Sequence, residues 1–454
     1  MHARDLLTGV LVASLAACSP LSSPPDGSPG TSPDGGVGTS DGGTGSGGTG
    51  SDAGPVADAG SDNGGGAQDA GQGGGSGGNN QGGGGGGGGN VGSDCDGLVP
   101  AAPGAATEFR WSERDLREGT CDAAATDGTG HIALTWQHHF QPGDTKLAFI
   151  DPSNNSQAGS YGGTVLRFFG KASGFIGGDC QGSNCVQQRF VLDPVGHEVY
   201  ASEHDSNAAG LQADDATSGM IQIRQPNMAD GGSGILLDAI DESGAIRWTR
   251  ALDGAFRLSG TRSVIVAVDR KGNVLAISSS QNRFAAGAWA GQWFDRDGNA
   301  GPVFEAVPPG LFVAQLYERV GDGLFVNGVA ADGSPGWIGQ FDAQATVMSP
   351  PPDWLAARPR TTLHMVHGGT GYAVLPNPEN NAACEQKVDV ISPSGQFCGS
   401  STFSIGGGAC TTSSIIVGWD GTVVQQGPRD RESCSAADHV CTCTYRYWSG
   451  YFRG

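Results

Sequence analysis

The chain has 454 residues, of which 80 are Gly, and its 46 Asp and Glu against 25 Lys and Arg give a net charge of −21. An acidic protein repels phosphate backbones, so these numbers argue against a nucleic-acid partner, and the glycine content argues against a helical bundle. Glycine makes up 31 of the 75 residues from Ser19 to Ser93, whereas the part from Asp94 onward holds every Trp, Phe and Tyr. A core is therefore expected only in that second part.

The N-terminus has the features of an export signal. The apolar run Leu6–Leu15 is too short to span a bilayer and has the length of a signal-peptide core. It ends in Leu15-Ala16-Ala17-Cys18, which resembles the lipobox of bacterial lipoproteins. The resemblance implies a signal peptide at 1–17, lipidation of Cys18 and attachment to a membrane through acyl chains. Ser19 after the cysteine favours the bacterial outer membrane or cell surface; ordinary secretion is the alternative.

Residues 18–93 form a low-complexity Gly/Ser/Asp/Pro linker. Only four large aliphatic residues occur between 19 and 93, so the segment buries too little surface to offset its ordering entropy. We therefore expect a disordered tether of about 45–50 Å root-mean-square span. The globular domain is expected at 94–454.

Two units recur along the globular part. The first is a turn glycine followed by a short apolar strand, found at Gly130, Gly196, Gly272, Gly323, Gly371 and Gly421. The second is an apolar strand that ends in an Asp-x-x-Gly-like turn, found at 149–151, 240–244, 294–298, 341–342, 391–395 and, in degenerate form, 447–450. Asp accepts backbone hydrogen bonds in such a turn, and Gly supplies the positive φ that closes it.

The two units predict an all-β fold with two hairpins per repeat. Two long steps are interpreted as insertions, one near Cys180 and one at 203–234; without them the period is about 50 residues, which is typical of a β-propeller with four-stranded blades. Six blades are expected, with seven as the alternative. The segment around Thr107, with Phe109 and Trp111, would supply a strand that closes the ring with the last blade.

A family resemblance rests on two neighbouring segments, 240–248 (IDESGAIRW) and 266–274 (VAVDRKGNV). They resemble the propeller repeats of secreted bacterial surface lipoproteins, relatives of the quinoprotein-type and SBBP-type repeats. The resemblance implies the propeller fold. It says little about activity, because that of the family is mostly undefined.

Ten cysteines remain besides Cys18, and an even number behind an export signal predicts disulfides. Local pairing would join Cys180 to Cys185, and neighbouring positions suggest Cys95 with Cys121 and Cys384 with Cys398. The other candidates lie near the last blade: Cys410, Cys434, Cys441 and Cys443. The alternative is a zinc site formed by Cys434, Cys441, Cys443 and His439, but the spacing of these residues does not favour it.

Polar clusters offer few sites for chemistry. Asp295, Asp297 and Asn299 resemble the start of a calcium loop but lack the distant bidentate Glu, so a plain turn is expected and no cofactor is predicted. His131 and His197 are interpreted as turn residues. The preferred ligand site is the acidic 203–234 insertion, which gathers Glu203, His204, Asp205, Asp214 and Asp215; a solvated loop without function is the alternative.

These observations favour a lipid-anchored, non-catalytic module that displays or binds at the cell surface. Its expected partners are the membrane, through the acyl chains, and an extracellular protein or polysaccharide, with the protein itself a monomer. The alternative is a propeller hydrolase that acts on extracellular glycans through paired carboxylates.

Overall fold

The structure is a computed structural model that describes residues 94–98, 102–114, 119–138, 145–163, 165–181, 186–202, 208–214, 217–224, 234–253, 262–280, 289–308, 311–330, 332–366, 369–376, 385–404, 414–418, 420–426, 433–435 and 440–452. The predicted signal peptide, Cys18 and the linker lie outside these ranges. Within them, no helix has the length and apolarity that crossing a bilayer requires.

The described strands form seven antiparallel sheets, here called blades 1 to 7 in chain order. Blade 1 comprises β2 (Gly119–Thr126), β3 (Ile132–His138), β4 (Thr145–Asp151) and β5 (Ser156–Gly163). Blade 2 comprises β6 (Val165–Gly170), β7 (Phe175–Gln181), β8 (Val186–Leu192) and β9 (Glu198–Ala201). Blade 3 comprises β10 (Ala208–Asp214), β11 (Gly219–Arg224), β12 (Leu236–Ile240) and β13 (Ile246–Ala251).

The second half of the chain continues the pattern. Blade 4 comprises β14 (Arg262–Val268), β15 (Val274–Ser280), β16 (Trp289–Phe294) and β17 (Ala300–Val307). Blade 5 comprises β18 (Phe312–Glu318), β19 (Leu324–Val329) and β20 (Pro335–Phe341), followed by the short helix α1 (Asp353–Ala356). Blade 6 comprises β21 (Thr361–Val366), β22 (Gly371–Pro376), β23 (Glu385–Ile391) and β24 (Phe397–Ser404).

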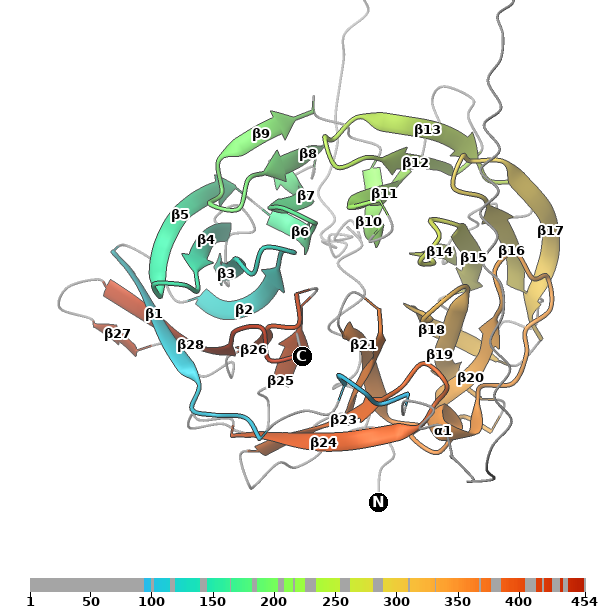
Figure 1. Cartoon of the computed structure of the whole chain (residues 1–454). Helices are drawn as coiled ribbons and strands as arrows, with labels where there is room; N and C mark the ends of the chain where they lie inside the picture. Colours follow the sequence, from blue (N-terminus) through green and yellow to red (C-terminus); the bar gives the residue numbers. More distant parts are fainter. Residues whose placement is uncertain are drawn as a thin grey trace, which may run out of the picture. The chain divides into compact units, whose positions relative to one another are not determined.

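Blade 7 joins the two ends of the propeller domain. Its order is β25 (Ser414–Val417), β26 (Val423–Gln426), β28 (Val440–Trp448) and β1 (Thr107–Arg114), with β27 (Ser433–Ser435) also paired to β28. The register runs from Thr107 opposite Tyr447 to Arg114 opposite Val440. The predicted closing strand is therefore confirmed, and the seven blades form a ring, the arrangement of a β-propeller (Figure 1).

The expected number of six blades is wrong, and the alternative of seven is correct. Both supposed insertions contain blade strands: Cys180 lies on β7, which pairs with β8, and β10 and β11 lie within 203–234. The first turns of blades 2 and 3 escape the repeat pattern because neither is an Asp-x-x-Gly turn. They end instead at Gly174 (φ 87°) and Ser218 (φ 55°). Gly196 lies in the turn between β8 and β9, the third and fourth strands of blade 2, rather than in a turn between first and second strands.

Among the described residues, the core consists of seven apolar clusters, one between each pair of neighbouring blades. On β3, Ile132 and Leu134 face the cluster shared with blade 7, whereas Ala133 between them faces the one shared with blade 2. Successive side chains point to opposite faces of a strand. A blade covered on both faces therefore needs a continuous apolar run rather than alternation.

The turn at 295–299 between β16 and β17 shows why the Asp-x-x-Gly pattern recurs. Gly298 N–H donates to Asp295 O at 2.9 Å, and Asp295 N–H donates to Asn299 O at 3.0 Å. Asp295 Oδ1 also accepts from the N–H groups of Asp297 (2.9 Å) and Asn299 (2.7 Å). Gly298 has φ 82°, a conformation that side-chain-bearing residues rarely adopt. The predicted roles of Asp and Gly are confirmed at this turn.

Aromatic side chains tie these turns to the preceding blade. A Cβ on Gly298 would lie 2.8 Å from the ring of Trp248, which belongs to β13 of blade 3. The indole N–H of Trp248 donates to Arg296 O at 3.0 Å. The same relation between a ring and a turn glycine holds for Phe149 with Gly196, Tyr200 with Gly244, and Trp354 with Gly395. Each such turn is therefore part of the contact between two blades.

Candidate binding surface

The predicted ligand loop is not an insertion. Residues 208–214 and 219–224 are β10 and β11, the first two strands of blade 3, and β11 pairs with β12. Asp214 is the last residue of β10, opposite Gly219. Glu203, His204, Asp205 and Asp215 lie outside the described residues. The acidic residues are thus divided between a strand end and segments that the structure does not describe.

Both carboxylate oxygens of Asp295, the first calcium candidate, are used by its turn. Besides the two backbone bonds to Oδ1, Oδ2 accepts the Asn299 side-chain amide at 2.7 Å. These hydrogen bonds, first that of the Asn299 side chain and then that of its backbone, hold the pKa of Asp295 below its usual value. In the described part of the chain, no group of three or more His, Cys, Asp or Glu is placed to hold a metal ion.

The two predicted turn histidines lie in turns. His131 Nδ1 is 2.8 Å from Thr129 Oγ1, and the backbone N–H of His131 donates to Asp127 Oδ1 at 2.8 Å. His197 makes the corresponding backbone bond to Asp193. A third histidine, His364 on β21, is half-buried, and desolvation lowers its pKa to about 4. It is therefore neutral at physiological pH.

The structure pairs Cys95 with Cys398, at a Cα–Cα distance of 5.2 Å. The expected pairings of Cys95 with Cys121 and of Cys384 with Cys398 are therefore wrong. The physical reason is ring closure, which brings the segment before β1 against blade 6 although the two cysteines are 303 residues apart in sequence. Neighbourhood along the chain is a poor guide because the first strand belongs to the last blade.

The backbone positions of the other cysteines are known in part. Cys434 on β27 lies opposite Cys441 on β28, as a cross-strand disulfide requires. Cys443 lies opposite Trp111 of β1. Cys121 and Cys180 lie on β2 and β7, and the remaining candidates Cys185, Cys384, Cys410 and His439 lie outside the described residues.

The two ends of the blade strands carry different kinds of connection. Antiparallel pairing puts the connections between first and second and between third and fourth strands at one end, here the turn end. They are four or five residues long, as at 127–131 and 295–299. The connections between second and third strands lie at the opposite end, here the loop end, and include 225–235 and 281–288. Most of the loop-end residues lie outside the described ranges.

Blade 5 departs from this pattern. Its second and third strands are joined by the tight turn 330–334 at the loop end, in which Asp332 Oδ1 accepts the Ser334 N–H at 2.8 Å. A fourth strand is replaced by residues 342–360, which include α1 and one bridge between Gln340 and Ser349. The loop end is thus variable in connection length even between neighbouring blades.

Carboxyl groups in the described part are held in their charged form wherever their pKa departs from its usual value. Each such shift is downward, at Asp151, Asp193, Asp241, Asp295, Asp332 and Asp389. A general acid in glycoside hydrolysis needs the opposite shift, because it must hold a proton at the working pH. These six groups therefore suit structural roles.

A cavity of about 410 Å³ lies beside the closing strand. Its lining comprises residues 103–106, Glu108, Thr402, Ser404, Arg446 and Trp448. Arg446 Nε donates to Glu108 Oε1 at 3.0 Å, and the buried Trp448 donates its indole N–H to Gly104 O at 3.1 Å. The cavity thus offers an ion pair but no open aromatic surface. No sequence pattern reveals it, since its walls come from both ends of the domain.

No protein-family model matches the chain, and no curated protein is significantly similar to it. Among solved structures, it is similar to the β-propeller domain of the Trilobed protease from Pyrococcus furiosus (9% identity, 70% of this chain and 94% of that chain, TM-score 0.44). A structure from a study of two prolyl endopeptidases matches at 11% identity over 68% of this chain and 45% of that chain, TM-score 0.41. A protein of unknown function from Bacteroides caccae matches at 8% identity over 63% and 94%, TM-score 0.36.

Proposed function

We propose that the protein is a lipid-anchored binding module of the bacterial cell surface, in which the propeller recognises an extracellular protein or polysaccharide through its loop end. The observation that carries the proposal is the difference between the two strand ends. The turn end is built from short turns that contact neighbouring blades, so its side chains are engaged in the fold. The loop end has connections of unequal length, the usual place for recognition on a rigid scaffold.

The composition of the loop-end connections supports a polar partner. Residues 225–233 read QPNMADGGS and residues 377–384 read NPENNAAC, so the two segments contain five Asn or Gln side chains and no aromatic or branched aliphatic one. Such groups donate and accept hydrogen bonds, as glycan hydroxyls and peptide backbones require.

Binding without catalysis is supported by the carboxyl groups. The Asp side chains that recur in the propeller are occupied by turns, as Asp241 is by the N–H groups of Ser243 and Ala245. The pKa shifts described above are opposite to the one that a general acid needs. The hydrolase alternative has no comparable support among the described residues.

The anchor is supported by the Leu15-Ala16-Ala17-Cys18 sequence and by the linker that follows it. Cys18→Ser in the full chain is expected to move the protein from the membrane fraction to the soluble fraction and to abolish incorporation of labelled fatty acid. Unchanged fractionation and labelling would contradict the anchor.

Binding is tested with the full-length Cys18→Ser protein on a panel of bacterial and host polysaccharides and surface proteins, with product analysis of every glycan that binds. Replacing 281–288, a cysteine-free loop-end connection, by a short Asn-Gly turn is expected to weaken binding at least tenfold. The matched control is Asp297→Ala at the turn end of the same blade, which is expected to bind normally.

The possible results separate the two functions. Binding that the control variant loses and the loop variant keeps would place recognition away from the loop end and overturn the proposal. Release of reducing ends from a bound glycan would support the hydrolase instead.

A further inference from the structure

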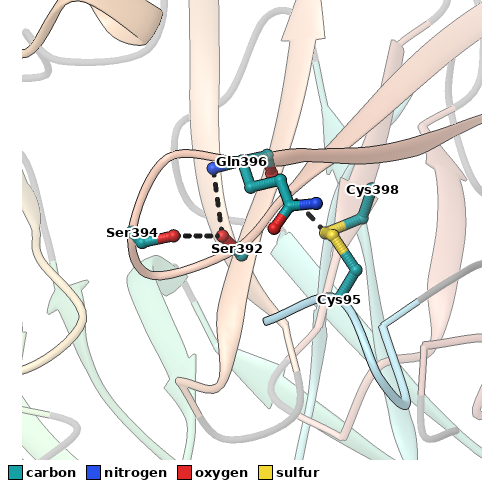
Figure 2. The surroundings of a disulfide bond; sticks show 5 residues. All are labelled: Cys95, Ser392, Ser394, Gln396 and Cys398. Carbon is teal, nitrogen blue, oxygen red and sulfur yellow. Dashed lines mark hydrogen bonds between the residues drawn. A yellow bond between two sulfur atoms is a disulfide. The ribbon is translucent and has the colours of Figure 1, made fainter. Parts of the chain in front are cut away.

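The chain enters the propeller through a turn that is bonded to blade 6. In residues 94–98, Leu98 N–H donates to Cys95 O at 2.9 Å, and Leu98 packs in the cluster between blades 6 and 7. Cys95 is buried, and its sulfur is bonded to that of Cys398 on β24 (Figure 2). The first fixed point of the domain is therefore covalent.

The ring closure that follows is noncovalent in the described part. After residues 102–106 the chain forms β1, which lies at the edge of blade 7 and pairs with β28. Contacts near its first residues include the Trp448 indole bond to Gly104 and the ion pair between Arg446 and Glu108, whose side chain is 42% exposed. Exposed ion pairs contribute little to stability. Farther along β1, Phe109 and Trp111 are buried in the cluster between blades 7 and 1.

Tension on the chain before residue 94 would act differently with and without the disulfide. Without it, the load would reach β1, an edge strand whose hydrogen-bonded pairs open one after another when one end is pulled. With it, the load passes from Cys95 to Cys398 and bypasses β1. Rates of such forced opening depend on the weakest element in the loaded path.

The receiving strand, β24, is also the edge strand of its blade, but Cys398 lies beside a closed turn rather than at a free strand end. Cys398 lies two residues beyond the turn 392–396, in which Gln396 N–H donates to Ser392 Oγ at 3.0 Å and Ser392 Oγ lies 3.0 Å from Ser394 Oγ (Figure 2). Trp354 packs against Gly395 of the same turn. Farther along β24, Phe403 is buried against Trp448. A pull at Cys398 therefore meets a closed and packed hairpin.

We propose that the Cys95–Cys398 disulfide is a mechanical clamp that transfers tension from the N-terminal segment into blade 6 and keeps the closing strand β1 unloaded. The biological need for a clamp rests on the proposed surface tether, because a domain held by its N-terminal segment is under tension whenever its partner moves. The physical claim itself concerns only the load path within the propeller.

Single-molecule pulling tests the clamp on the full-length Cys18→Ser protein. One handle is attached at the N-terminus and the other to a ligation peptide inserted in the 281–288 connection of blade 4. Cys95→Ser/Cys398→Ser is expected to show an early extension step of less than about 70 Å, because the contour length of residues 95–114 at roughly 3.5 Å per residue is reduced by the distance that they already span in the fold. The oxidised parent is expected to show no such step before the blades unfold.

A second measurement covers the case in which the double variant does not fold. The oxidised parent is held at low constant force, and a reductant is then added; the same early step is expected only after reduction. As a control, the N-terminal handle is moved to the C-terminus, where the load enters at β28 before it reaches Cys398, so reduction is not expected to produce the step that is seen from the N-terminus.

An early step in the oxidised parent, or equal first-event forces with and without the disulfide, would overturn the clamp. Neither measurement uses a lipid, a membrane or a binding partner. Failure of the proposed anchor or of ligand binding would therefore leave these results unchanged, and failure of the clamp would leave the binding proposal standing.

Discussion

The turn end and the loop end of the propeller differ in what a change of sequence would disturb. At the turn end, Asp127 Oδ2 accepts the Gly174 N–H of the next blade at 2.7 Å, and Trp248 packs on Gly298 of the blade after its own. At the loop end, a Cβ on Gly333 in the turn of blade 5 would meet no other atom within 4 Å. One end thus sets the spacing of the blades, and the other is free to vary.

The difference explains how one fold combines stability with adaptable recognition. A turn that touches its neighbour cannot change length without displacing a blade. A connection that joins two strands of one blade costs little when lengthened, because closure entropy grows only logarithmically with length. Each of the following predictions compares the two ends or separates strands from connections.

The largest effect is expected when strands are removed rather than connections. Deleting 205–232 removes β10 and β11, and with them Met220 and Ile221 of two interblade clusters. We expect this protein to lose its cooperative urea transition, monitored by Trp fluorescence. Replacing 281–288 by a short turn should leave the transition intact. A cooperative transition in the deletion variant would mean that blade 3 is dispensable.

Gly298→Ala is expected to destabilise the fold by about 2–4 kcal/mol, since it forces a side chain into positive φ and against the Trp248 ring. Gly333 at the loop end has nearly the same φ as Gly298, 83° against 82°, but the Cβ added by Gly333→Ala would contact no other atom within 4 Å. This substitution should cost about 1 kcal/mol. Urea midpoints measure both, and equal losses would contradict the role of the aromatic contact.

Asp269→Ala at the turn end is expected to cost about 2–3 kcal/mol, because it leaves buried donors unsatisfied. The Asp269 side chain is fully buried and accepts hydrogen bonds from Lys271 N–H and from both the N–H and the amide of Asn273, each at 2.9 Å. Asp332→Ala at the loop end removes an exposed carboxylate and should change stability by less than about 0.5 kcal/mol. Chemical denaturation would reveal whether the order is reversed.

The smallest effect is expected in the pH dependence of stability. The folded-state pKa of Asp295 lies below its unfolded value, so its carboxylate stabilises the fold above about pH 4, and this contribution is lost as the pH falls through the folded pKa. When the pH is lowered from neutral to below about 4, the urea midpoint of Asp295→Asn should therefore fall by less than that of the parent. Asp297→Asn, which removes a neighbouring charge in the same turn, is the control. Identical pH dependence in the parent and Asp295→Asn would contradict the assignment.

Much of the propeller is predictable because its hairpins use local chemistry. The turn at 295–299 is visible as Asp-x-x-Gly, and Phe109 and Trp111 mark a strand that lacks a local partner. The first turns of blades 2 and 3 are not recognisable in this way, since Gly174 follows Lys-Ala-Ser and Ser218 replaces glycine altogether. A search for a residue pattern finds only those turns whose backbone conformation is stabilised by the same residue types.

The candidate surface is less predictable. The acidic 203–234 segment resembles a loop because its strands, AAGLQAD and GMIQIR, carry few β-branched residues and no turn signal. Burial against blades 2 and 4, rather than local propensity, makes them strands. The distinction between turn end and loop end follows only from knowing which strands are first, second, third and fourth in each blade.

By itself, the sequence determined the all-β class and the chemistry of the Asp-Gly turns, because each depends on residues close together in the chain. Tertiary structure alone decided the number of blades, the aromatic contacts between blades and the partner of Cys95. These depend on ring closure, which places residues 303 positions apart within bonding distance. No local pattern encodes that contact, since it is created by the sum of seven blade-to-blade packings.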